Sequence, residues 1–313
     1  MNEPPVEFVY CWCNGADPEF WAEKARYSPG AETRDDADCR YIDNGELVRS
    51  LASVALYAPW IRRIWLLVND VSAIPPAVAR DPRIVVVRHR EVIPAEHLPL
   101  FNALSIELWL DRIPDLSERF VYLNDDTFLG APVTPRDFFT DDGKVICRYF
   151  RNRIVPSGGA YEAALLNARA FLRDVAADHP LDREWLKAAP YYPHHNADGC
   201  LKGVFSDFRA SFPEPLTASA SCRFHTPGQF SRDIFSLWAM ATGRGVFRGI
   251  WRNRIVRRLG WPRAESAFGK LSNADVFETI ERHRPSFFCL NDTEESTDAQ
   301  RARLRSWLER RFP

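Results

Sequence analysis

Two adjacent acids, Asp125 and Asp126, follow an apolar, strand-like stretch in the run FVYLNDDTFLG at residues 120–130. Asn124 stands directly before them. Carboxylate and amide oxygens at the end of a strand are hard ligands that suit Mg²⁺ or Mn²⁺, and the phosphates of a diphosphate would complete the coordination shell. The same residues would also suit an ordinary turn or a helix cap. On this run alone, both interpretations stay open.

The elements around these acids alternate between strand and helix patterns. Strand patterns cover residues 6–12, 61–68, 83–89, 119–125 and 144–150, and helix patterns cover 44–58 and 102–110. This alternation predicts an α/β fold with a mainly parallel sheet covered by helices. Ligands of such sheets lie beyond the carboxyl ends of the strands. The first, second and fourth of these strands each end in Asn or Asp, so we expect their polar ends to share one crevice.

The second half of the chain has a different pattern, which predicts mostly helices. The helical stretches are 160–178, 200–210, 231–242, 246–259, 273–283 and 294–311. No linker rich in Gly or Ser and no internal repeat separates the two halves. We therefore expect a core over residues 1–150 and a helical region over 151–313 that completes the site within one body.

The composition is that of a folded protein near charge balance. Hydrophobic residues make up 46% of the 313 residues, which is ample for a packed core. The 41 Lys and Arg against 42 Asp and Glu leave a net charge of −1, which gives no argument for nucleic-acid binding. Seven scattered cysteines without a repeated CxxC pair predict free thiols and no structural zinc site. No apolar run has the length of a signal peptide or a membrane span, so we expect a cytoplasmic protein.

A basic stretch covers residues 244–263, with seven arginines and no acid between Asp233 and Glu265. Apolar residues interleave with these arginines in the pattern of an amphipathic helix. Such a helix could contact the inner face of an anionic membrane, or it could hold a phosphorylated polymeric acceptor. It could equally be a solvated face that packs through one apolar stripe.

Four blocks of the sequence resemble the Stealth family of sugar-phosphate transferases. The first block is FVYCWCNGADPEFW (8–21), the third is HHNADGCLKGVFSDF through CRFH (194–225) and the fourth is FFCLNDT (287–293). The second block consists of RYIDNGELVRSLASVALYAPWIRRIWLLVND (40–70), the segment from His89 to Glu91 and LPLFNALSIELWLDRIPDLSERFVYLNDDTFLG (98–130). The resemblance implies a GT-A-like, nucleotide-sugar-binding core over residues 1–150. It also implies transfer of a hexose-1-phosphate from a UDP-sugar donor to a hydroxyl of a glycan acceptor, with release of UMP and Mg²⁺ or Mn²⁺ as cofactor. The product would be a phosphodiester in a surface, capsular polysaccharide.

The implied reaction attacks phosphorus, so it depends mainly on positioned charges. A divalent ion, an arginine and a general base for the acceptor hydroxyl form the minimum set. We expect Asp125 and Asp126 to hold the metal. Asn291 and Asp292, near the far end of the chain, could close the same site. Without the resemblance, the run from Asn291 to Thr293 would be interpreted as the cap of the last helix.

Asp43, Asn44 and Glu46 open the first predicted helix. Asn44 suits the N-cap, and a helix N-terminus that faces a crevice is also a phosphate site. The resemblance gives a catalytic role to Asp43, which precedes the helix and is expected to have a free carboxylate. Arg40 could clamp a phosphate oxygen bidentately. We expect Asn44, Glu46 and Asn124 to contact the donor.

His194 and His195 lie in a loop ahead of a predicted helix. A histidine in isolation is more often structural, but the family carries a catalytic histidine in this block, and imidazole suits deprotonation of a sugar hydroxyl near neutral pH. The spacing to Phe212 favours His195 over His194, although the Pro that commonly follows the family's histidine is lacking here. Arg223 matches a later arginine of the family and would contact the transferred phosphate.

The first predicted strand and the loop after it could form part of the donor site. The residues concerned are Tyr10, Trp12, Asn14, Gly15 and Asp17. The two aromatic rings could stack on uracil, and glycine would allow close approach of the backbone to a ligand. The alternative is a set of buried strand aromatics followed by a turn.

Two other functions remain open from the sequence. An ordinary glycosyltransferase of the same fold would attack the anomeric carbon of the donor and release UDP. A non-catalytic module would bind sugar nucleotides or glycans without turnover.

Overall fold

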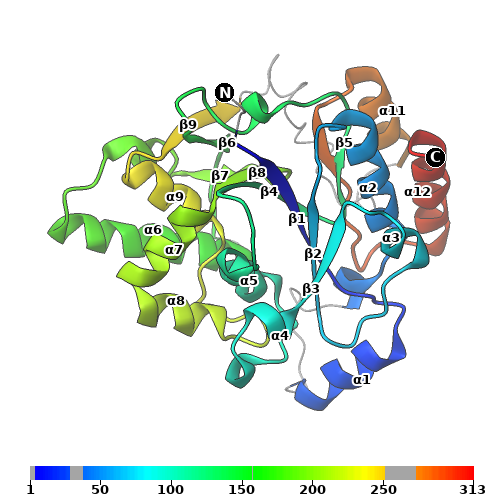
Figure 1. The fold of residues 1–313 in the computed structure, drawn as a ribbon, viewed down its shortest axis with the longest axis horizontal. Coiled ribbons are helices and arrows are strands. Elements are labelled where there is room, and N and C mark those ends of the chain that lie inside the picture. The colour runs from blue at the N-terminus through cyan, green and yellow to red at the C-terminus, as the bar shows by residue number, and fades with distance from the viewer. Residues whose placement is uncertain (1–3, 29–37, 157, 251–272) are drawn as a thin grey trace.

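A five-stranded sheet forms the centre of the protein (Figure 1). The computed structural model describes residues 4–28, 38–156, 158–250 and 273–313. The strands run in the order β3-β2-β1-β4-β8, with β1 to β4 parallel and β8 antiparallel to β4. Their bounds are β1 Val6–Trp12, β2 Ile64–Val68, β3 Ile84–Arg88, β4 Arg119–Asn124 and β8 Asp198–Leu201. The predicted α/β fold with a mainly parallel sheet is confirmed.

The helices flank this sheet on two sides. Figure 1 shows α2, α11 and α12 gathered on one side and α6 to α9 on the other. The helices are α1 Pro18–Tyr27, α2 Glu46–Tyr57, α3 Pro76–Ala79, α4 His89–Val92, α5 Ala103–Ile106, α6 Ala160–Asp178, α7 Lys202–Ser211, α8 Pro213–Ala220, α9 Asp233–Ala241, α11 Asn273–His283 and α12 Asp298–Arg311. Short 3₁₀ helices cover Asp38–Tyr41, Ala95–His97, Glu107–Arg112, Pro135–Asp137 and Arg183–Lys187. Because both faces are covered, the central strands are apolar along nearly their whole length.

Two smaller sheets join the second half of the chain to the first. β5 (Thr127–Leu129) pairs antiparallel with β10 (Phe287–Cys289). β6 (Val145–Arg153) lies between β7 (Tyr191–Pro193) and β9 (Gly245–Ile250), antiparallel to the former and parallel to the latter. Besides its helices, the second half therefore supplies strands that the sequence pattern did not predict.

The predicted helix over 246–259 is wrong for its first residues, because Gly245–Ile250 forms strand β9. Two glycines lower the helix propensity of this segment, and β6 offers it a pairing edge. Residues 251–263 of the basic stretch lie outside the described residues, so the predicted contact of 244–263 with a membrane or an acceptor stays a prediction. Among the described helices, none combines the length and apolarity that crossing a bilayer requires.

The structure supports neither of the two alternative interpretations as helix caps. Helix α2 has Gly45 at its N-cap position, with a φ of 88°, and Asn44 lies one residue outside. Helix α12 has Thr297 as its N-cap, in a reciprocal capping box with Gln300. The run Asn291 to Thr293 is therefore not a helix cap.

Candidate active site

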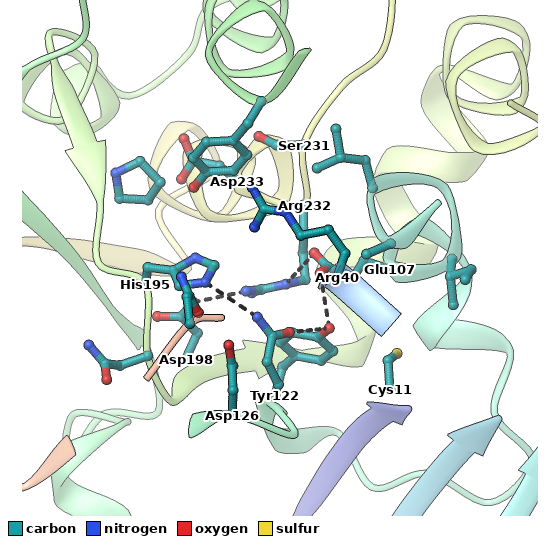
Figure 2. A pocket seen from close by; sticks show the side chains of 18 of the residues that line it. Cys11, Arg40, Glu107, Tyr122, Asp126, His195, Asp198, Ser231, Arg232 and Asp233 are labelled. Atoms are coloured by element: carbon teal, nitrogen blue, oxygen red, sulfur yellow. Dashed lines mark hydrogen bonds and ion pairs between the residues drawn. The ribbon is translucent and has the colours of Figure 1, made fainter. Parts of the chain in front are cut away.

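A cavity of about 970 Å³ lies at the carboxyl edge of the parallel strands (Figure 2). Its wall includes residues at or just after the ends of β1, β2, β3 and β4, namely Trp12, Asn69, His89 and Asp125. The predicted convergence is confirmed for the polar ends of β2 and β4, whereas Asn14 and Asp17 after β1 lie outside the cavity lining. Figure 2 shows Arg40, Asp126, His195 and Arg232 around this same space.

Most of the predicted site residues line the cavity. They are Trp12, Arg40, Glu46, Asn124, Asp125, Asp126, His194, His195, Asn291 and Asp292. The other predicted residues lie outside its lining: Tyr10, Asn14, Gly15, Asp17, Asp43, Asn44 and Arg223. The cavity therefore unites the acids, the histidines and the tail segment, and it leaves out most of the loop after the first strand.

The carboxylates that line the cavity include Glu46 from the start of α2 and Asp125 and Asp126 from the turn after β4. Burial raises the pKa of Asp125 well above its usual range, and the charges of Asp126 and Asp43 raise it further. Burial also raises the pKa of Glu46 well above its usual range, with added repulsion from Asp43. Buried acids that repel one another would be stabilised by a cation among them.

The acid turn fits a divalent cation. The Oδ1 atom of Asp126 is buried and has no hydrogen-bond partner among the described residues. Such hard oxygens suit Mg²⁺ and Mn²⁺. Across the described ranges, no group of three or more His, Cys, Asp or Glu side chains is arranged to hold a metal by itself. Oxygens of a bound ligand or of water would complete the coordination shell.

The pairing of β10 with β5 returns the far end of the chain to the cavity. The Leu290 N–H donates to the carbonyl oxygen of Asp126 over 3.1 Å, and Asn291 and Asp292 follow in the cavity wall. Arg301 of α12 holds both carboxylate oxygens of Asp292, at 2.7 and 3.2 Å. The charge of Asp292 is thus already compensated within the protein.

The expectation that Asp43 has a free carboxylate is wrong. Its Oδ1 accepts hydrogen bonds from the backbone N–H groups of Gly45 at 2.6 Å and Glu46 at 3.0 Å, which fixes the start of α2. Asn44 is buried, donates to the Glu46 carboxylate over 3.0 Å and accepts from Arg305 over 3.1 Å. Asp43 and Asn44 therefore support the start of α2 and do not themselves line the cavity.

The two adjacent histidines have different surroundings. His194 is 1% exposed, and its ring packs against Phe150 at a centroid distance of 5.6 Å. His195 is half-buried, and its Nε2 lies 3.4 Å from Nδ2 of Asn124 at the end of β4. His195 thus stands beside the acid turn, whereas His194 is part of the packed interior.

The arginine predicted for the phosphate, Arg223, points elsewhere. Its Nε donates to the carbonyl oxygen of Pro99 over 2.9 Å, and its Nη2 donates to that of Leu98 over 3.2 Å. Its guanidinium also lies over the ring of Tyr27. Arg40, in contrast, is exposed and lines the cavity.

Sequence analysis missed Arg232, which also lines the cavity. Its guanidinium binds Asp198 over 2.9 Å and Glu107 over 3.2 Å, and it lies over the ring of Tyr122. The Tyr122 hydroxyl is in turn 2.8 Å from Oδ1 of Asn124. The only sequence signal for this arginine is its place in the polar run QFSRD, directly before an apolar helix.

The aromatic residues of β1 divide between the core and the cavity. Tyr10 is fully buried, and its hydroxyl bonds to Ser50 over 2.8 Å, so its ring cannot stack on a base. Trp12, two residues on, does line the cavity. A stacking role therefore remains open for Trp12 alone of this pair.

The loop after β1 binds the protein's own chain. The Asn14 N–H donates to the Ser72 hydroxyl, and Asp17 caps helix α1. A Cβ at Gly15 would lie 1.5 Å from the carbonyl oxygen of Tyr41. The close backbone approach predicted at this glycine is present, but its partner is the segment ahead of α2.

The fold and the cavity define an α/β protein with an acidic crevice at the carboxyl edge of its sheet, where such folds bind ligands. The family models for Stealth protein conserved regions 2 and 4 match residues 40–146 and 278–313. This chain belongs to the Stealth family. The resemblances at 40–130 and 287–293 fall within these matches, whereas those at 8–21 and 194–225 stay predictions.

Several curated proteins are similar to this chain. An exopolysaccharide phosphotransferase of Streptomyces coelicolor is 30% identical over 99% of this chain and 51% of its own length. The exopolysaccharide phosphotransferase CpsY of Mycobacterium tuberculosis is 31% identical over 98% and 57%. The chain thus spans about half the length of these two relatives. The receptor polysaccharide phosphotransferase WefC of Streptococcus oralis is 28% identical over 93% and 91%.

Among solved structures, the galactosyltransferase LgtC, in complex with donor and acceptor sugar analogs, is similar to this chain. The similarity covers 97% of this chain and 95% of LgtC, with a TM-score of 0.48 and 13% sequence identity.

Proposed function

We propose that this protein is a metal-dependent sugar-1-phosphate transferase. It would move a hexose-1-phosphate from a UDP-sugar to a glycan hydroxyl and release UMP, which builds a phosphodiester into a surface polysaccharide. The observation that carries the proposal is the meeting of the half-buried His195 with the acid pair Asp125 and Asp126 in one cavity. The Stealth family membership and the names of the relatives support the same reaction class.

The acids would serve the donor half of the reaction. Asp125 and Asp126 would hold Mg²⁺ or Mn²⁺, and the ion would supply positive charge to the diphosphate oxygens. Arg40, exposed in the cavity wall, is free to approach a phosphate oxygen from the open side. The cavity itself would exclude water from the phosphorus that is attacked.

The acceptor half would depend on His195. Its ring takes the proton from the acceptor hydroxyl while the oxygen attacks the phosphorus bonded to the sugar oxygen. The new bond joins the acceptor oxygen to that phosphorus, and the bond to the bridging oxygen of UMP breaks. Asn124, held by Tyr122, keeps the ring at the edge of the acid turn.

The leaving nucleotide tests the proposal. The purified chain is incubated with Mn²⁺, a panel of UDP-hexoses and candidate glycan acceptors, and UMP and UDP are quantified separately by chromatography. UMP that forms only when donor, acceptor and Mn²⁺ are all present is the expected result. Accumulation of UDP without UMP would show a conventional glycosyltransferase instead.

The same panel tests the binding-module alternative. Titration calorimetry measures the affinity for each UDP-hexose in the presence of Mg²⁺ and without acceptor, so that donor binding is measured apart from catalysis. Donor binding without turnover across all acceptors would support a non-catalytic module and reject the transferase.

A further inference from the structure

Arg148 is a buried arginine in the wall of the cavity, near the middle of β6. Arg148 is 4% exposed, and it lines the cavity together with the acids and histidines. The Nε and Nη1 atoms are buried and have no hydrogen-bond partner among the residues that the structure describes. Buried donors of a charged group are normally satisfied, because an unmade hydrogen bond there is unfavourable.

Aromatic rings surround this guanidinium without satisfying its donors. The guanidinium carbon lies 5.8 Å from the ring centroid of Phe138 and 5.6 Å from that of Phe287. Attraction between a cation and an aromatic face stabilises the charge, but it gives the N–H groups no oxygen. Burial also lowers the pKa of Arg148 to about 10, in spite of the opposing effect of Asp198.

The acids near Arg148 are engaged with other groups. Asp198 is paired with Arg232 over 2.9 Å. Asp137 accepts hydrogen bonds through Oδ2 from the backbone N–H and the hydroxyl of Thr134, at 2.7 and 3.0 Å. Neither acid therefore supplies an oxygen to the open donors of Arg148.

Arg232, a half-buried arginine of the same cavity, shows the contrast. Arg232 is held by two carboxylates, those of Glu107 and Asp198, so its charge and donors are compensated inside the protein. Arg148 has the charge, the burial and the open donors, and no ion pair joins it to an acid of the described residues. We propose that Arg148 binds an oxyanion of a substrate, a phosphate or carboxylate group, through these N–H groups.

The anion site itself does not depend on the proposed function; only the identity of the molecule that carries the anion rests on it. In a sugar-1-phosphate transferase, the oxyanion belongs either to the donor diphosphate or to an anionic group of the acceptor glycan. Arginine suits both, because its guanidinium donates several hydrogen bonds to the oxygens of either group.

Equilibrium binding of inorganic phosphate tests the subsite without turnover. Titration calorimetry without added metal compares wild type with Arg148→Met, which removes the charge and the donors. The matched control is Arg153→Met, which removes an exposed arginine at the end of the same strand. We expect Arg148→Met to weaken phosphate binding at least about 30-fold and the control to change it by less than about twofold. Equal phosphate affinity in wild type and Arg148→Met, or no phosphate binding to wild type, overturns the proposal.

A second variant and a second ligand complete the test. If circular dichroism shows that Arg148→Met does not fold, Arg148→Gln is measured in its place against the same criteria. UDP with Mg²⁺ then distinguishes the carriers: a parallel loss of UDP affinity assigns the anion to the donor, and unchanged UDP affinity beside lost phosphate affinity assigns it to the acceptor. Because no turnover is measured, absence of UMP release would refute the proposed transferase and leave the anion site standing.

Discussion

His195 and Asn124 meet where β4 leaves the sheet, with 3.4 Å between His195 Nε2 and Asn124 Nδ2. The Tyr122 hydroxyl lies 2.8 Å from Oδ1 of the same amide, so Asn124 is contacted at both of its polar atoms. The residue that directly precedes the acid pair therefore contacts the imidazole that we expect to act as the base. This contact joins the acceptor half of the site to the donor half.

We predict that His195→Ala lowers turnover by about 10²–10⁴, because a positioned base contributes that much to proton transfer. His194→Ala should lower turnover far less. It should instead lower the Tm more than His195→Ala does, since His194 is 1% exposed and its removal leaves a cavity in the interior. Initial rates of UMP release and thermal unfolding separate the two effects. Equal and mild effects on turnover would return both histidines to a structural role.

The parallel sheet could be predicted because its strands are local, unbroken apolar runs. Strands β2 and β4 are buried on both faces, and burial of that kind leaves a plain signature in the sequence. The crevice could be predicted from the polar residues that follow these apolar stretches. The acids Asp125 and Asp126 could be placed in it because parallel strands end at a common edge.

The rest depends on contacts between segments far apart in the chain. Residues 245–250 have no strong preference of their own and form a strand because β6 pairs with them. Arg148 lies in an ordinary strand sequence, and Arg232 lies in a short polar run, so only the folded chain shows their cavity positions. The side chains of Asp43 and Arg223 were not placed correctly from the sequence for the same reason. They form hydrogen bonds with backbone groups, and the sequence does not reveal these contacts.

We predict that Asp292 and Arg301 act as a pair in stability. Their side chains are 6% and 16% exposed, and two hydrogen bonds join them. Asp292→Asn and Arg301→Gln should each lower the free energy of unfolding by about 1–3 kcal/mol. The double variant should lose less than the sum of the two, because the second substitution removes a partner that is already unpaired.

Urea unfolding of the four proteins measures this coupling. Additive losses would contradict the pairing. Mn²⁺ titration of the same variants tests the predicted metal role of Asp292. If Asp292 is a ligand, Asp292→Asn should weaken Mn²⁺ binding and Arg301→Gln should not.

We predict an acid-sensitive contribution to stability from His89, which is 4% exposed at the start of α4. Burial lowers the pKa of His89 from 6.5 to about 3, with a smaller effect of Arg88. The unfolded chain binds this proton below about pH 6.5 and the folded chain does not, so the contribution is complete above that pH and is lost as the pH falls towards 3. Between pH 7 and pH 5, the free energy of unfolding of His89→Gln should fall by about 2 kcal/mol less than that of wild type.

Urea unfolding at pH 7 and pH 5 measures the difference for His89. His179→Gln is the matched control, because His179 is exposed at the end of α6. The acids with raised pKa values act in the opposite direction, but they are common to all three proteins and cancel in the comparison. A pH dependence of His89→Gln equal to that of wild type would contradict the prediction.

The last prediction concerns the metal. Asp126→Asn replaces a carboxylate by an amide of the same shape, so the fold should persist while the negative charge beside the buried Oδ1 is lost. We expect Mn²⁺-dependent release of UMP to fall by about 10²–10³, the loss that removal of one electrostatic contact to a transition state produces. In wild type, EDTA should abolish activity and added Mn²⁺ should restore it, whereas added Mn²⁺ should not rescue the variant.

Asp141→Asn provides the control for that comparison, since Asp141 is an exposed acid whose side chain is 81% accessible. It makes the same chemical change at a surface position, so its rate and its Mn²⁺ dependence should match those of wild type. Mn²⁺ should also raise the Tm of wild type and of Asp141→Asn, because a ligand that binds the folded state stabilises it. The Tm of Asp126→Asn should rise less at the same concentration. If Asp126→Asn keeps full Mn²⁺-dependent activity, the acid turn is a structural turn, and the metal must be sought elsewhere in the cavity.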